Sequence, residues 1–281
     1  MNEIVKYDNT LNTLQFKDFT AMDYNILMCL CHKVRDRGQD ILNFDFNELK
    51  ALTEYGNHSN ELFAADLERM AAKLLKVNAT HITGDKKSLF VLFPTFTIDS
   101  KKATLTVRVN KDFTFILNEL TDNFTRFELK EFAELDGKYT KTLYRILKQY
   151  KYNGWWKPTV EELALVLDIP QNYDNKKIMA RIIKPAIDIL QGKFEDLKCE
   201  PIRAKKRGAP VERYYFTFRA EKQIPGQQTI ADYPGVLPGE EKSKPKPGKR
   251  AKNNFNNLEK SPSTPKTKEE WKQYEEQLLD N

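Results

Sequence analysis

One order of predicted elements occurs twice in the first 220 residues and constrains the fold more than any other feature of the sequence. Each copy predicts a helix, a short extended segment, a second helix, a polar turn, a third helix and alternating β-rich sequence. These segments are residues 20–37, 41–46, 47–52, 53–59, 60–77 and 80–109 in the first copy, and residues 138–151, 153–158, 160–167, 168–173, 174–190 and 195–218 in the second. The repeated order indicates two similar units in tandem.

The middle helix of each copy carries the same start signal. Asp45 and Thr159 are residue types that cap helix N-termini, and a glutamate follows each of them three positions later, at Glu48 and Glu162. Helix, short strand, helix, turn, helix and hairpin is the order of a winged helix, a relative of the helix-turn-helix. The sequence therefore predicts an α+β protein with two tandem winged helices.

Composition sets off a third region after the two units. From residue 221 to the end, seven of the thirteen prolines fall within 61 residues, with lysine-rich runs between them. Such a segment buries too little apolar surface to offset the entropy of ordering it, which predicts a mostly disordered tail. The predicted domains are residues 1–120 for the first winged helix, 121–220 for the second and 221–281 for the tail.

The end of this tail has a helical pattern of its own. Thr267 and Glu270 match a capping box, while Trp271, Tyr274 and Leu278 fall on one helix face. This pattern predicts a short terminal helix with an apolar stripe but no core. Two alternatives remain open: the helix docks on the globular part of the chain, which is the favoured interpretation, or it docks on another protein.

The third helix of the second copy has two contrasting faces. At 100° per residue, Lys177, Arg181 and Lys184 share a narrow stripe, and an apolar set lies roughly opposite: Ile178, Ile182, Ala186 and Ile189. Most basic stripes belong to solvated surface helices. Here a basic hairpin turn, residues 204–210, follows at the position of the wing. That coincidence favours DNA binding.

A winged helix places its third helix in the major groove and its hairpin on flanking backbone, which assigns roles to these side chains. Arg181 is predicted to contact a guanine edge, and the turn residues are predicted to neutralise phosphate. The complete set of predicted DNA contacts is Lys176, Lys177, Arg181, Lys184, Lys205, Lys206, Arg207, Lys138 and Lys141.

Pro185 interrupts this third helix. It lacks a backbone donor and clashes one turn back, at a cost of about 3 kcal/mol in mid-helix. The helix is therefore predicted to kink or loosen near Arg181. We hypothesise that this bend fits the helix to both core and groove.

The first copy differs in charge. Its third helix mixes acidic and basic residues, and its predicted hairpin, LFVLFPTF in residues 89–96, is strongly apolar. A core or protein interface is predicted for this unit, with DNA backbone contact as a secondary role.

The sequence contains no recognisable catalytic motif. His32, His58 and His81 form no metal-binding pair, no Asp-x-Asp occurs, and none of the three Gly-Lys pairs belongs to a P-loop. We therefore predict a DNA-binding protein that is not an enzyme and has no metal or cofactor. The net charge of +6 is too small to establish a polyanionic partner by itself.

Cellular setting is predicted from the cysteines and the apolar runs. Cys29 and Cys31 lie in an apolar helical run and are most simply buried thiols, which favours a reducing, cytoplasmic setting. No apolar run approaches membrane-spanning length, so no membrane partner is predicted.

Two motifs in the second copy resemble the replication initiator (Rep) proteins of iteron-containing, theta-replicating plasmids. The family's Lys-Tyr-Ser/Thr-x-x-Leu-Tyr-x-x-Leu core is matched by Lys138, Tyr139, Thr140, Leu143, Tyr144 and Leu147, and its Leu/Ile-x-Pro-Ala-x-x-Ile element by Ile183, Pro185, Ala186 and Ile189. The resemblance covers residues 10–220 and is most specific over residues 124–219.

This resemblance implies a cycle of binding and assembly. Such initiators bind direct repeats at the plasmid origin as monomers, promote melting of adjacent AT-rich DNA and recruit host helicase and initiator machinery. As dimers joined through the first winged helix, they often repress their own promoter. The alternatives are a winged-helix transcriptional regulator without origin function and an enzyme, such as a primase or nuclease, with an unrecognised site.

Overall fold

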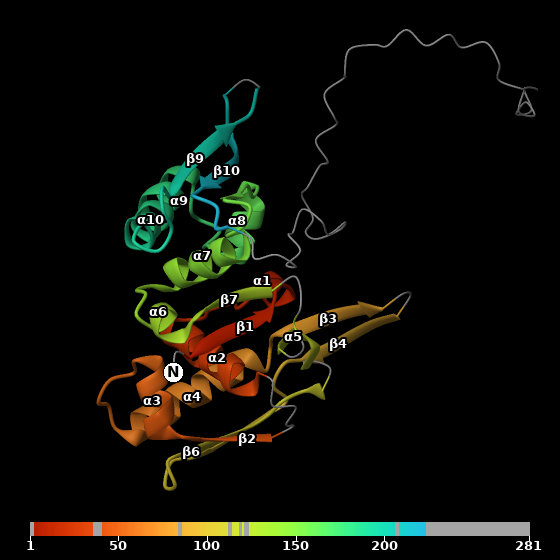
Figure 1. Cartoon of the computed structure of the whole chain (residues 1–281), viewed down its shortest axis with the longest axis vertical. Helices are drawn as coiled ribbons and strands as arrows, with labels where there is room; N and C mark the ends of the chain where they lie inside the picture. Colours follow the sequence, from red (N-terminus) through yellow and green to blue (C-terminus); the bar gives the residue numbers. More distant parts are fainter. Residues whose placement is uncertain are drawn as a thin grey trace, which may run out of the picture. The chain divides into compact units, whose positions relative to one another are not determined.

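The computed structural model describes residues 3–35, 41–83, 86–111, 114–117, 120, 124–205 and 208–222 (Figure 1). Within these residues the predicted fold, α+β with two tandem winged helices, is confirmed. The predicted tail lies outside the described residues from position 223 onward, and so does its predicted terminal helix.

The first winged helix combines three helices with a three-stranded antiparallel sheet in the order β2-β6-β5. Asp45 caps α3 as predicted by accepting from the backbone N–H of Asn47 and Glu48, while the Glu48 carboxylate pairs with Lys33. The helices are α2 (Ala21–Val34), α3 (Phe46–Thr53) and α4 (Asn60–Leu74), and the strands are β2 (Ile41–Asp45), β5 (Thr95–Asp99) and β6 (Thr104–Arg108).

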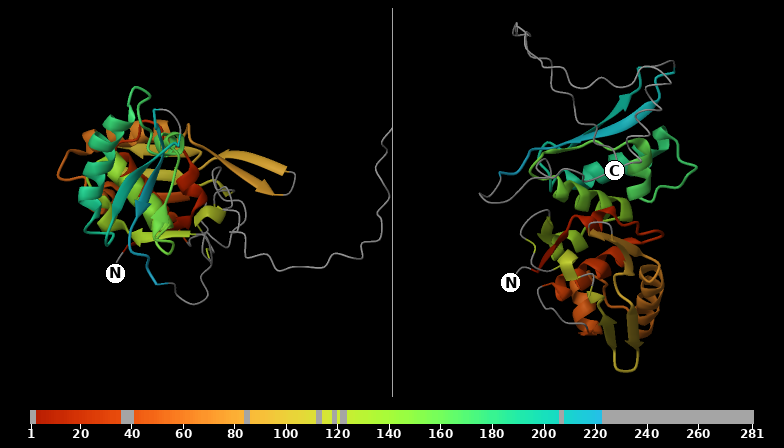
Figure 2. Two further views of the ribbon diagram at one scale, coloured as in Figure 1. Left: turned by 90° about the horizontal axis from the view of Figure 1, so that it is seen from above. Right: turned by 90° about the vertical axis from the view of Figure 1, so that its right-hand side faces the viewer.

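An extra hairpin is inserted between α4 and β5. Its strands β3 (Asn78–Thr83) and β4 (Lys86–Val91) form a separate two-stranded sheet that projects away from the helices (Figures 1 and 2). The prediction of one apolar hairpin in residues 89–96 is therefore wrong, because this segment ends β4 and begins β5. Leu92 and Phe93, which connect the two sheets, are buried as part of the core.

The second winged helix repeats the strand order of the first. Its sheet is β8-β10-β9, so in both units the last strand pairs with the other two. Thr159 and Glu162 form the predicted capping box at the start of α8. The elements are α7 (Lys138–Gln149), β8 (Trp155–Trp156), α8 (Val160–Val166), α9 (Asn175–Ile178), a π-helical turn (Met179–Ile183), α10 (Lys184–Leu190), β9 (Lys198–Arg203) and β10 (Val211–Thr217).

A two-stranded sheet that was not predicted joins the beginning of the chain to its middle. Strand β1 (Ile4–Asp8) pairs antiparallel with β7 (Phe124–Glu128), and Val5 and Phe127 from its two strands are buried in the core. Three short helices accompany it: α1 (Thr10–Thr13), α5 (Thr114–Leu117) and α6 (Leu129–Ala133). Residues on both sides of position 120 therefore share one sheet.

Helix α2 forms the centre of the first core. Thr20 and Asp23 close a capping box at its start, and nearly all of its later side chains are buried. Cys29 and Cys31 are among them, which confirms the prediction of buried thiols. Burial raises the pKa of each thiol to about 12, so both are neutral near pH 7.

Candidate nucleic-acid interface

The third helix of the second winged helix presents its basic side chains to solvent. Asp174 caps it by accepting from the backbone N–H of Lys177 at 2.7 Å. The core side is formed by Ile178, Ile182, Ile183, Ala186 and Leu190. The exposed side carries Lys176, Lys177, Arg181 and Lys184, all of the basic residues predicted for this helix.

The helix loosens where Pro185 predicts it. Residues Met179–Ile183 form a π-helical turn, in which the N–H of Lys184 donates to the carbonyl of Met179, five residues earlier. Pro185 has no N–H to donate, and its ring needs space near the carbonyl one turn back. The wider π turn provides that space and includes Arg181, so the predicted loosening is confirmed.

The π turn also changes which residue closes the core. In a continuous α-helix, Ile189 would return to the face of Ile178 after three turns of about 3.6 residues. In the structure Ile189 is 41% exposed and Leu190 is buried. The prediction that Ile189 faces the core is wrong, because one wider turn shifts the later residues by about one position.

Replacing Pro185 with alanine tests the role of this turn. The alanine restores a backbone donor, so we expect the free energy of unfolding to rise by about 1 kcal/mol and affinity for the protein's own DNA site to fall about fivefold. Chemical denaturation and a DNA-binding titration measure the two effects. Pro170→Ala, in the exposed turn before this helix, is the matched control. Unchanged stability and unchanged affinity in Pro185→Ala would refute the hypothesis.

The wing follows as a hairpin of β9 and β10 that extends past the helices (Figure 1). Its turn is closed by the N–H of Ala204, which donates to the carbonyl of Pro210 at 2.8 Å. Lys205 is exposed at the start of the turn, whereas the predicted contacts Lys206 and Arg207 lie outside the described residues.

Two residues that were not predicted complete this surface. Arg203 is exposed at the end of β9, and its Nη1 donates to the carbonyl of Ala209 across the wing. Tyr214 on β10 places its hydroxyl 3.0 Å from Oδ1 of Asn175, in the first turn of α9. Tyr214 therefore fixes the wing relative to the start of the basic helix. Only the basic side chain of Arg203, next to the turn, could have been noticed in the sequence.

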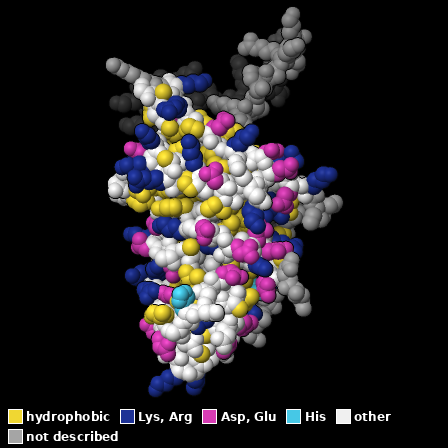
Figure 3. All heavy atoms as spheres, turned by 90° about the vertical axis from the view of Figure 1, so that its left-hand side faces the viewer, with side chains coloured by type: hydrophobic (Ala, Val, Ile, Leu, Met, Phe, Trp, Pro, Cys, Tyr) yellow, Lys and Arg dark blue, Asp and Glu magenta, His cyan; other side chains and the backbone are white. Residues whose placement is uncertain are grey.

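Helix and wing both carry exposed basic side chains, which are Lys176, Lys177, Arg181 and Lys184 on the helix and Arg203 and Lys205 on the wing. Figure 3 shows the side of the molecule that carries α10, and in its upper part Lys and Arg side chains lie among hydrophobic side chains and several acidic ones. Groups of like charge on one face attract polyanions and depend on ionic strength. The geometry suits a duplex that meets helix and wing together.

The two predicted contacts on α7 lie in different surroundings. Lys141 is 1% exposed and donates to the carbonyls of Phe132 and Ala133 at 2.7 and 3.0 Å. No phosphate can reach that ammonium in this structure, so its inclusion among the contacts is corrected. Lys138 remains a prediction, although its ammonium is already bonded to the carboxylate of Asp168 at 3.0 Å.

The third helix of the first unit, α4, carries charge pairs instead of a basic face. Asp66 pairs with Arg69, and Lys73 reaches Asp23 of α2 at 2.6 Å. Tyr55 also bonds to Asp66. Because these basic groups are already partly neutralised, α4 is a weaker site for phosphate than the third helix of the second unit.

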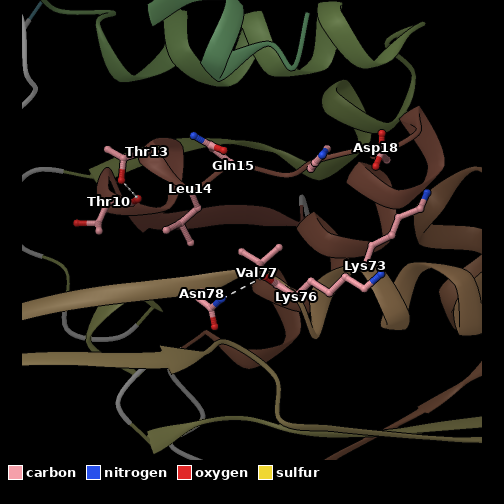
Figure 4. Close-up of a pocket in the computed structure, with 10 residues that line it drawn as sticks. Thr10, Thr13, Leu14, Gln15, Asp18, Lys73, Lys76, Val77 and Asn78 are labelled. Carbon is pink, nitrogen blue, oxygen red and sulfur yellow. Dashed lines mark hydrogen bonds between the residues drawn. The ribbon is translucent and has the colours of Figure 1, made fainter. Parts of the chain in front are cut away.

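A polar pocket of about 690 Å³ lies beside α4 (Figure 4). Thr10, Thr13 and Leu14 line one side of it, and Val77 and Asn78 line another. Its lysines include Lys73, whose ammonium is bonded to Asp23, and the hydroxyl of Thr10 donates to the carboxylate of Asp8. Among the described residues, no group of His, Cys, Asp and Glu could hold a metal ion.

Within the described ranges, every helix is too short or too polar to cross a bilayer.

Comparisons with known proteins agree with this geometry. The chain matches the model described as "Initiator Replication protein, WH1" over residues 4–148 and the model "Initiator Rep protein, WH2" over residues 159–218. A probable replication protein Rep of Bifidobacterium longum (strain NCC 2705) is 37% identical over 223 residues, which are 78% of this chain and 74% of that protein.

A solved structure has the same fold. The Pi initiator protein, crystallised in complex with iteron DNA, matches with a TM-score of 0.59 and 14% identity, over 79% of this chain and 99% of that one. The two family models together span most of the chain: the first covers the first winged helix and continues through most of α7, and the second covers the second winged helix from α8 onward. The chain therefore belongs to the family of initiator replication proteins.

Proposed function

We propose that this replication initiator binds direct repeats at a plasmid origin through its second winged helix. One observation carries the proposal: the exposed basic side of α9 to α10 and the basic wing occur together, at the two positions where a winged helix meets DNA. The family relationship and the iteron-bound Pi initiator support it.

The chemistry of the exposed side chains assigns their roles. Lys176, Lys177 and Lys184 surround Arg181 on the exposed side of the helix. Lysines are compact charges that suit phosphates, whereas a planar guanidinium can donate two parallel hydrogen bonds to O6 and N7 of guanine. Arg181 is therefore proposed to specify sequence, and the wing residues Lys205, Lys206 and Arg207 to neutralise phosphate.

Arg181→Ala separates recognition of the DNA sequence from electrostatic attraction to the phosphates. We expect it to lower the discrimination between repeat and random DNA by about 1–3 kcal/mol, because a base-edge contact exists only on the specific site. Lys205→Ala is the matched control on the wing. It is expected to weaken binding to repeat and random DNA equally, and to reduce the slope of log affinity against log salt concentration by about one unit or less. Titrations of both DNAs at several salt concentrations measure both effects.

The result that contradicts the base-reading role is an equal loss on both DNAs for Arg181→Ala. Circular dichroism and thermal melting of each variant show whether the fold is intact. Since Arg181 and Lys205 are both exposed, neither substitution removes core packing.

Origin binding is tested by footprinting purified protein on the DNA that flanks its gene. Protection of evenly spaced direct repeats is the expected result. A single inverted repeat over the promoter would instead identify a transcriptional regulator. Absence of any footprint would mean that the basic side is only a solvated face.

The later steps of initiation extend this proposal. We propose that bound monomers promote opening of adjacent DNA and recruit the host helicase and initiator machinery in the cytoplasm. Dimers joined through the first winged helix are proposed to repress the gene. The protein itself is proposed to act without catalysis, so purified protein with metal ions should neither incorporate nucleotides nor cleave strands.

A further inference from the structure

The basic side of α9 to α10 contains one small apolar side chain among its cations. Ala180 is exposed, whereas the opposite side of the helix packs on the core. Since Ala180 lies outside the core, core packing does not account for its small size. The exposed side chains around it are all cationic and belong to Lys176, Lys177, Arg181 and Lys184.

Ala180 lies between two long side chains of one row. Residues four apart are neighbours on a helix surface, which places Ala180 between Lys176 and Lys184. In a regular α-helix such a row drifts by roughly 40° at every step of four residues. The π turn Met179–Ile183 has more residues per turn, so it reduces this drift and keeps the row straight. Ala180 therefore leaves a short side chain between two ammonium groups, directly beside Arg181.

This arrangement suits close contact with a base. The flanking lysines attract the phosphates on either side, and at Ala180 the helix surface ends in a methyl group. Thymine presents its 5-methyl group in the major groove, where small apolar side chains such as alanine contact it. Cytosine has no methyl group at this position, so the contact distinguishes the two pyrimidines.

We propose that Ala180 recognises a thymine of the repeat through its 5-methyl group, next to the guanine contacted by Arg181. Consecutive Cα atoms lie about 3.8 Å apart, close to the base step of about 3.4 Å, so the two bases are expected to be neighbours. The inference rests on the proposed function of the second winged helix. It adds to Arg181 a second residue that determines specificity.

The second half of the helix is a poorer place for such a contact. Pro185 and Ile189 are also exposed, and within residues 175–190 they and Ala180 are the exposed apolar residues. Asp188 is exposed next to Ile189, and its carboxylate repels phosphate. Ala180 lies instead among the cations, and for this reason we choose it.

Replacing single thymines of the repeat by deoxyuridine tests the proposal, because this change removes only the 5-methyl group. The full-length protein is titrated with one protected repeat in which each thymine is replaced in turn. We expect one replacement, at a thymine next to a guanine, to weaken binding about fourfold, the value for one buried methyl group.

Ala180→Ser shows which residue contacts that methyl group. The serine hydroxyl faces the methyl group, so affinity for the natural repeat should fall about fourfold or more. The same deoxyuridine should then change binding by less than about twofold, because the contact is already lost. Ala72→Ser, on the exposed side of α4 in the first winged helix, is the matched control with the same change in helix propensity. It should keep the fourfold loss of the wild type.

Two results overturn the proposal while the proposed function stands. One is a wild-type protein that prefers the repeat to random DNA but tolerates deoxyuridine at every thymine. The other is an undiminished deoxyuridine effect in Ala180→Ser, which assigns the methyl contact to another residue. A wild-type protein with no preference for the repeat refutes the proposed function itself, and the role of Ala180 with it.

Discussion

Replacing Arg145 with alanine is expected to lower the free energy of unfolding by about 3 kcal/mol, the largest effect of any single change considered for this protein. Arg145 lies on α7 and is 2% exposed. Its Nε donates to the hydroxyl of Tyr7 at 3.1 Å, and its Nη2 donates to Oδ1 of Asn12 at 2.9 Å and to the carbonyl of Leu11 at 3.2 Å. The guanidinium thus ties α7 to the start of the chain.

A polar and aromatic network surrounds this guanidinium. Asn12 extends it through Nδ2, which donates to Thr125 at 3.0 Å and to Gln149 at 2.9 Å. The ring centroids of Phe16 and Tyr24 lie 5.2 and 5.6 Å from the guanidinium carbon of Arg145. Oriented dipoles and ring faces offset the cost of burying this charge. Burial raises the pKa of Tyr7, and the nearby positive charge of Arg145 opposes that shift.

The magnitude follows from opposing contributions. Truncation to alanine leaves a cavity, which costs about 2–5 kcal/mol of stability for a large buried side chain. It also leaves the carbonyl of Leu11 without this hydrogen bond, which costs about 1–3 kcal/mol. Release of a desolvated charge acts in the opposite direction, which brings the expected net loss to about 3 kcal/mol. Arg145→Met preserves most of the volume and should lose less. Urea unfolding of both variants measures the effect, and a loss below about 1 kcal/mol for alanine would show that the network is not stabilising.

Lys141 is expected to make the stability of the protein rise between pH 7 and pH 10. Burial lowers the pKa of Lys141 from 10.5 to about 7, and Asp136 opposes this shift. In the unfolded chain the ammonium of Lys141 keeps its proton up to about pH 10.4. Between the two pKa values the unfolded state therefore binds more protons than the folded state, and the free energy of unfolding increases with pH. Below about pH 7 Lys141 is protonated in both the folded and the unfolded state, so the stability gained at higher pH is absent.

We expect this rise to be about 2 kcal/mol. Each pKa unit corresponds to about 1.4 kcal/mol, but the carbonyls of Phe132 and Ala133 accept from the ammonium and favour its charged form, which reduces the effect. Urea unfolding from pH 6 to pH 10 measures it. Lys141→Met removes the titrating group, so its curve should be flatter than that of the wild type by this amount. Parallel curves for the two proteins would contradict the assignment.

The candidate DNA surface followed from the sequence because its determinants are local. Helical periodicity places Lys177, Arg181 and Lys184 on one side regardless of what covers the other, and Pro185 alone predicts a disturbed turn. What that turn does to the core was not predictable, since the choice between Ile189 and Leu190 depends on a hydrogen bond from Lys184 to Met179.

The sequence alone determined the two tandem winged helices, their capped middle helices and the basic helix and wing, because periodicity, caps and turns act over a few residues. Tertiary structure decided the partner of β1, about 120 residues away, and the surroundings of α7. In isolation Lys141 and Arg145 resemble solvent-facing charges. They are buried because α2, β7 and α10 all pack against α7, and local sequence does not specify which distant elements cover a helix.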